Sequence, residues 1–162
     1  MKHDLIKVPE RHGGFTDLFT IDYTDMGVAA AQTDNDNRDV VLDALAAGDW
    51  VLDGLLEILT PWNSLTTAPI DTFTASVGPV GTETATIASA YLKTTGTPPT
   101  GMVIAKTTYA FTARYLPVAA INLVCRFDPD SSAKPGESTA GKLAIWLQIS
   151  RWADRVGNRQ IG

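Results

Sequence analysis

Cysteine and histidine are the scarcest chemically useful residues in this chain of 162 residues. Cys125 is the only cysteine, which excludes an internal disulfide and any zinc site built from paired thiolates. The two histidines, His3 and His12, both precede residue 15. We therefore expect no histidine general base in a rigid cleft, and without one the hydroxyls and Cys125 lack an activating neighbour. Because Cys125 alternates in phase with Leu123 and Phe127, we expect it to be a buried apolar residue.

Long apolar runs are missing as well. Asn122 interrupts the run 118–125, and Asp53 and Glu57 interrupt the run 50–59, so no stretch approaches the about 20 residues of a membrane span. The first ten residues carry charges where a secretory signal has its apolar segment. The sequence therefore predicts no membrane partner and no export by the general pathway.

Basic charge is in short supply, with 13 lysines and arginines against 18 aspartates and glutamates. Residues 1–14 carry +1 and residues 150–162 carry +2, which leaves −8 on the body between them. An acidic body repels phosphate backbones, so nucleic acid is not expected as a partner. The basic ends either reach for an acidic neighbour or are solvated chain without a role.

Alternation with period two is the dominant pattern in the rest of the sequence. The composition, 44% hydrophobic and 19% charged, is that of one globular domain. We place this domain at 15–150, after an N-terminal arm at 1–14 and before a C-terminal tail at 151–162. A long loop is expected at 24–39, and strands are expected at 15–23, 72–77, 84–91, 107–115, 119–127 and 141–149. Short strands separated by glycine- and proline-rich turns predict an all-β antiparallel sandwich or barrel.

The segment 49–59 fits two patterns. Val51, Leu52, Leu55, Leu56 and Leu59 form a helical stripe, whereas the alternating set is interrupted at Gly54. The glycines and the β-rich surroundings favour a strand, and Pro61 ends the segment in either case.

Two groups of carboxylates were considered for chemistry. Asp34, Asp36 and Asp39 resemble a calcium loop, but Arg38 occupies the place of a third acidic ligand and no distal glutamate follows. An acidic surface loop is the better interpretation, and no metal site is expected. Asp53 and Glu57 form a conceivable catalytic pair, although a solvated face explains their spacing more simply.

Four tryptophans remain: Trp50, Trp62, Trp146 and Trp152. Such rings could line a sugar-binding groove. Trp146 is expected to point away from Ile145 and Leu147, which indicates either a subunit contact on a second face or burial in the domain's own core.

The order of elements resembles the capsid decoration, or cement, proteins of tailed bacteriophages. The resemblance covers most of residues 15–151, and Asp34–Asp39 and the arginine-rich tail have no counterpart in it. It lies in five features of the sequence. These are the strand 17–23, the segment 40–48 that leads through a turn into 49–52 and on to Thr60-Pro61-Trp62, the hairpin at 72–78, the loop 96–101 and the late strand 139–149. The resemblance implies a jelly-roll-like β-sandwich, no enzymatic activity, no cofactor, and assembly as homotrimers on the shell.

We therefore expect a virion structural protein on the outer surface of the capsid, made in the host cytoplasm. Its partners would be the major capsid protein and further copies of itself. The rival hypotheses are a carbohydrate-binding or tail-associated binding protein and, from the enzyme class, a hydrolase that uses carboxylates alone. The residues expected at the interface are Lys7, Arg11, Trp146, Arg151, Trp152, Arg155 and Arg159.

Overall fold

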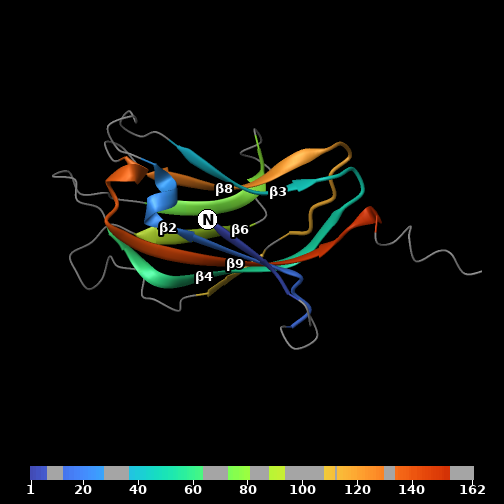
Figure 1. Cartoon of the computed structure of the whole chain (residues 1–162), viewed down its shortest axis with the longest axis horizontal. Coiled ribbons are helices and arrows are strands. Elements are labelled where there is room, and N and C mark those ends of the chain that lie inside the picture. Colours follow the sequence, from blue (N-terminus) through green and yellow to red (C-terminus); the bar gives the residue numbers. More distant parts are fainter. Residues whose placement is uncertain are drawn as a thin grey trace, which may run out of the picture.

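Strands make up nearly all the regular structure of the chain (Figure 1). The computed structural model describes residues 1–6, 13–27, 37–63, 73–80, 88–93, 108–111, 113–129 and 134–153. Two short 3-10 helices, η2 (Tyr23–Met26) and η5 (Pro135–Glu137), accompany the strands. The strands are β1 (Lys2–Leu5), β2 (Asp17–Asp22), β3 (Arg38–Leu45), β4 (Trp50–Asn63), β5 (Phe73–Pro79), β6 (Ala88–Lys93), β7 (Thr108–Ala110), β8 (Ile121–Pro129) and β9 (Ala140–Ser150).

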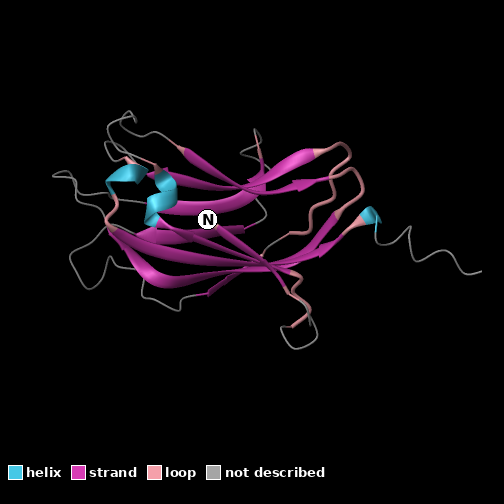
Figure 2. Cartoon of the chain, in the orientation of Figure 1, coloured by secondary structure: helices cyan, strands magenta, loops and turns pink. Residues whose placement is uncertain are grey.

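The strands form two antiparallel sheets that face each other, as Figure 2 shows. One sheet has the order β1-β2-β9-β4-β7 and the other has the order β3-β8-β5-β6. The expectation of an all-β antiparallel sandwich is confirmed. The chain crosses between the sheets at every described step from β2 to β9 except β5 to β6.

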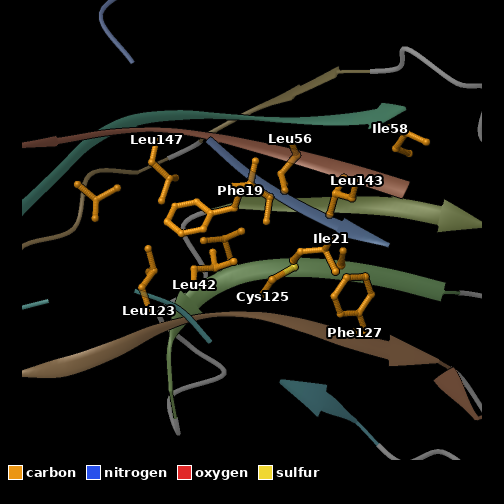
Figure 3. Close-up of a cluster of buried hydrophobic side chains, with 14 of the residues drawn as sticks. Phe19, Ile21, Leu42, Leu56, Ile58, Leu123, Cys125, Phe127, Leu143 and Leu147 are labelled. Atoms are coloured by element: carbon orange, nitrogen blue, oxygen red, sulfur yellow. The ribbon is translucent and has the colours of Figure 1, made fainter. Parts of the chain in front are cut away.

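The core lies between the two inner faces (Figure 3). Register explains its composition, because Phe19, Ile145 and Leu56 lie directly opposite one another on β2, β9 and β4 and are all fully buried. The facing sheet contributes Leu123, Cys125 and Phe127 from β8. Period two in the sequence has thus produced one buried face on each sheet.

The ambiguous segment 49–59 is a strand, as the glycines and the β-rich surroundings indicated. β4 pairs with β9 from Trp50 to Asn63, with register shifts at Val51/Asp53 and beyond Ile58. Gly54 faces the core, and its missing side chain makes room for the ring of Phe111, since a Cβ at Gly54 would lie 2.5 Å from Phe111 Cζ. The glycine that interrupts the alternation is therefore a packing requirement.

Four boundaries differ from the sequence expectation. Pro61 does not end the segment, because β4 continues to Asn63 and Pro61 lies in the register shift between Thr60 and Asn63, where no ladder hydrogen bond is needed from it. Residues 2–5 of the N-terminal arm form β1, which pairs with β2 through backbone hydrogen bonds that need no apolar pattern. Residues 38–45 form β3, although 38 and 39 were expected in a loop and the rest had no assignment. Among the described residues of the expected strand 107–115, regular pairing with β4 is confined to 108–110, and Tyr115 meets Val51 in an isolated bridge.

Cys125 is fully buried, as expected, and burial raises the pKa of its thiol far above the ordinary value. We expect the native protein to react with a thiol reagent only through unfolding, and Cys125→Ala to cost about 1–2 kcal/mol without other effect. Since the unfolded thiol ionises and the buried one does not, stability should fall as the pH rises above about 9. Rapid labelling of the native thiol, measured by mass spectrometry, would contradict this.

Candidate functional site

The predicted interface residues divide into those that the structure describes and those that it does not. Lys7, Arg11, Arg155 and Arg159 lie outside the described residues. Trp146, Arg151 and Trp152 lie within them, and the structure gives each a different environment.

Trp146 lies on the outer face of its sheet, as expected. Its neighbours Ile145 and Leu147 are fully buried, whereas Trp146 is half-buried and packs against Phe15, with ring centroids 6.1 Å apart. The indole Nε1 donates a hydrogen bond of 3.4 Å to Glu57. Trp146 is therefore neither a core residue nor a fully open contact surface, because its own chain covers part of the ring.

Trp152 is exposed at one end of the sandwich, and the backbone there is held firmly. Its N–H donates to Asp49 Oδ1 at 2.7 Å, while Asp49 Oδ2 accepts from the N–H of Ala46 at 2.9 Å. Asp49 is only 4% exposed, so its charge is used inside the turn between β3 and β4. The ring of Trp152 lies against Gly48, whose positive φ of +88° suits glycine. The turn thus presents a fixed tryptophan to solvent.

Other exposed apolar side chains gather at the same end. Gly48 N–H donates to the carbonyl of Pro117 at 3.1 Å, and the N–H of Val80 donates to the carbonyl of Asn122 at 3.0 Å. These bonds bring the β3–β4 turn, the segment before β8 and the end of β5 together with the end of β9. We call this surface the apolar tip, and define it by Val80, Leu116, Val118 and Trp152, which are 41%, 46%, 95% and 55% exposed.

Arg151 departs from the role that the sequence suggested. Its guanidinium donates to Asp43 on β3 at 2.7 Å and to Asp17 on β2 at 3.3 Å, and so joins the two sheets. Burial by itself lowers the pKa of Arg151, but the hydrogen bond and the charge of Asp43 reverse this and raise it above its ordinary value. Arg151 therefore binds two carboxylates of its own chain, and we leave it out of the charges available to a partner.

Asp17 is the most buried of the three charged groups Arg151, Asp43 and Asp17. Its contact with His3 corrects the expectation that neither histidine belongs to the folded domain. His3 lies on the ordered strand β1, where its Nε2 is 2.8 Å from Asp17 Oδ1 and its ring stacks on Phe19. The assumption that the arm holds its histidines apart from the rigid body is wrong for His3. Thr16 Oγ1 donates to Asp17 Oδ2 at 2.7 Å and accepts from Ile149 N–H at 2.9 Å. His3 and Thr16 therefore contact different oxygens of the same buried carboxylate.

The two acidic groups weighed for chemistry have ordinary structural partners where they are described. Asp39 forms a two-point ion pair with Arg126, at 2.8 and 2.9 Å, while Asp34 and Asp36 lie outside the described residues. Asp53 Oδ1 accepts from the N–H of Gly54 at 2.8 Å, and Glu57 accepts the hydrogen bond from the indole of Trp146. Among the residues with described positions, no three histidine, cysteine or carboxylate side chains are grouped for a metal, and no helix is long and apolar enough to cross a membrane.

Sequence reasoning found Trp152 but missed the rest of the apolar tip. The signal was the uncharged run Leu116-Pro117-Val118-Ala119-Ala120, of which only Ala119 and Ala120 were assigned, as the beginning of a strand. Four of its residues are exposed, and β8 begins only at Ile121. Nothing in the sequence placed this run beside Trp152, because that neighbourhood depends on the sheet order.

Comparison with known proteins gives no match, whether to a family model, to a curated protein or to a solved structure.

Proposed function

We propose that the protein is a capsid decoration protein that binds the outside of an icosahedral phage head through its apolar tip. The order of elements that resembles such proteins supports the proposal, and so does the tip itself. Four large apolar side chains from three segments are exposed at the same end of the sandwich. A gathering of exposed apolar side chains is a common mark of a protein contact.

The charges beneath the tip favour a dry contact. Asp49 is buried in its turn, and Arg151 is paired with Asp43 and Asp17. A partner that covers Trp152 and Val118 therefore does not remove water from an unpaired charge of Asp49 or Arg151. Desolvation of an unpaired charge would be costly. Burial of Trp152 alone would contribute about 2 kcal/mol or more to binding.

The stabilising effect on the shell follows from linkage. A protein that binds assembled capsid subunits and not separated ones shifts the equilibrium towards the closed shell. We also propose that the copies associate as homotrimers, which the resemblance supports. Trp146 contributes less to this argument than expected, because Phe15 and Glu57 of its own chain cover it in part.

The docking surface can be tested with tip variants on heads of the phage that encodes the chain. We expect Trp152→Ala, and separately the double variant Leu116→Ser with Val118→Ser, to reduce retention on purified heads by about tenfold or more. The four-residue tip is apolar, so the loss should persist at high salt. Retention is measured by co-sedimentation of purified heads with added protein over a salt series.

The matched control makes the same kind of substitution, apolar residue to serine, at positions away from the tip. Val41 and Leu59 are also exposed apolar residues, at 48% and 37%, but they lie within β3 and β4. Val41→Ser with Leu59→Ser should leave retention unchanged. Equal losses in both double variants would reject the tip as the docking surface, and so would unchanged retention in the tip variants. If the protein is found only on phage tails and not on heads, the decoration role itself is rejected.

A further inference from the structure

A pocket of about 560 Å³ opens on the side of the sandwich, where one chain segment separates from β4. Phe111 N–H donates to the carbonyl of Gly54 at 3.0 Å, and Tyr115 exchanges two backbone hydrogen bonds with Val51, at 2.9 and 3.0 Å. Between these two anchored points the described residues of the segment do not pair with β4. The gap is lined by Leu52, Asp53, Phe111, Ala113, Arg114 and Gln148.

Three polar side chains converge on this pocket from three segments. Arg114 comes from the separated segment, Asp53 from β4, and Gln148 from β9, directly opposite Asp53. Among the described residues, the side chains of Arg114 and Gln148 have no hydrogen-bond or ion-pair partner, and only one oxygen of Asp53 is used, by Gly54 N–H. Leu52 and Phe111 add apolar surface. The lining is therefore mainly polar with a smaller apolar part, and convergent polar groups of this kind fix the orientation of a bound polar molecule.

Two tryptophans occupy register positions on either side of Gln148 in the same sheet, although neither of them lines the pocket itself. Trp50 lies opposite Ser150, Asp53 opposite Gln148, and Leu55 opposite Trp146, so Ser150, Gln148 and Trp146 are successive residues on one face of β9. The register positions of Trp50 and Trp146 are therefore about 13 Å apart along β9, with the pocket between them. Trp50 is 37% exposed and Trp146 is half-buried.

We propose that this pocket binds a neutral carbohydrate, as a short oligosaccharide that extends between Trp50 and Trp146. The pocket carries one carboxylate and one guanidinium, so it has no net formal charge to favour an ion. Together with the amide of Gln148 it offers both donors and acceptors, which match a row of hydroxyl groups. The aromatic rings offer apolar faces to the C–H surfaces of the sugar rings.

A free amino acid is the competing ligand, since its amine and carboxylate could pair with Asp53 and Arg114. The length of the site argues against it, because the register positions of the two tryptophans are about 13 Å apart along β9, which is more than one amino acid covers. The open amide of Gln148 also calls for a ligand with further hydroxyl or amide groups. The proposal is independent of capsid binding, since none of the pocket residues belongs to the apolar tip.

The test screens the full chain on a printed array of neutral and acidic oligosaccharides, and then titrates the strongest binder by calorimetry. We expect a neutral oligosaccharide to bind, and Arg114→Ala, Gln148→Ala and Trp50→Ala each to weaken it by about tenfold. Asp53→Asn should also weaken binding while its side-chain oxygen still accepts from Gly54 N–H. The control Lys142→Ala removes an exposed cation from the same sheet and should bind as the unchanged protein does.

Every other outcome rejects the proposal. Absence of binding to any oligosaccharide, a preference for acidic ones, or equal binding by the pocket variants and the unchanged protein would each do so. Binding of free amino acids without binding of sugars would assign the pocket to the competing ligand. Thermal unfolding of each variant, with a midpoint near that of the unchanged protein, ensures that a loss of binding reflects the pocket.

Discussion

Gly141→Ala is expected to lower the free energy of unfolding by about 3–5 kcal/mol. Gly141 begins the buried part of β9 with a φ of +143°, where a side chain is strained. A Cβ there would also lie 2.2 Å from Cδ2 of Trp62. Trp62 is 2% exposed and packs against Phe73 and Phe127, so its ring has no free space into which to move. Strain and overpacking therefore act together.

Gly13→Ala separates these two causes. Gly13 also has a positive φ, +66°, but a Cβ there would come no closer than 3.8 Å to Phe15. Only the backbone cost remains, about 1 kcal/mol. Both variants are compared by urea denaturation. Similar losses at the two positions would contradict the account of Trp62 packing, whereas partial recovery in Gly141→Ala combined with Trp62→Leu would support it.

Arg151→Met is expected to cost about 3 kcal/mol, although the residue is near the end of the described chain. Asp17 is 1% exposed, and loss of the guanidinium leaves a buried carboxylate with only His3 and Thr16 as side-chain partners. Removing one member of a buried ion pair typically costs about 3–5 kcal/mol, because the other charge stays desolvated. The lower end applies here because Arg151 keeps 30% of its side chain exposed.

Arg126→Met is the matched control for charge. It breaks the ion pair with Asp39. Because the side chains of Arg126 and Asp39 are 22% and 27% exposed, the free energy of unfolding should fall by at most about 1 kcal/mol. Chemical denaturation compares the two variants with Arg151→Met combined with Asp17→Asn, which removes the stranded charge and should restore part of the loss. Equal effects of Arg151→Met and Arg126→Met would show that Arg151 is an ordinary surface residue.

The sequence predicted what depends on local periodicity. The buried faces of β2, β8 and β9 follow directly from alternation, and the burial of Cys125 and the outward position of Trp146 follow with them. The edge strands β1 and β3 were missed, because an edge strand does not need such a pattern. Only two of the four residues of β1 are apolar or aromatic enough to suggest a strand, and β3 shifts its register between Val41 and Asp43.

The candidate sites depend on contacts between distant positions, which a single sequence does not report. Arg151 and Asp17 are 134 positions apart, and Trp152 meets Gly48 only because β4 lies beside β9. For the same reason, Arg151 was expected to attract a neighbouring subunit, although its partners Asp17 and Asp43 lie within the same chain. The exposed tryptophan of the tail could be predicted, but the surface to which it belongs could not.

Docking of the proposed decoration protein through its apolar tip is the central claim, and electron cryo-microscopy of phage virions that carry the protein, or of phage heads to which it has been added, tests it most directly. We expect density for the sandwich on the outside of the head, grouped in threes, with Trp152 and Val118 against the major capsid protein. A sandwich whose tip faces solvent while another surface contacts the shell would contradict the docking surface. Heads without this density would contradict the decoration role.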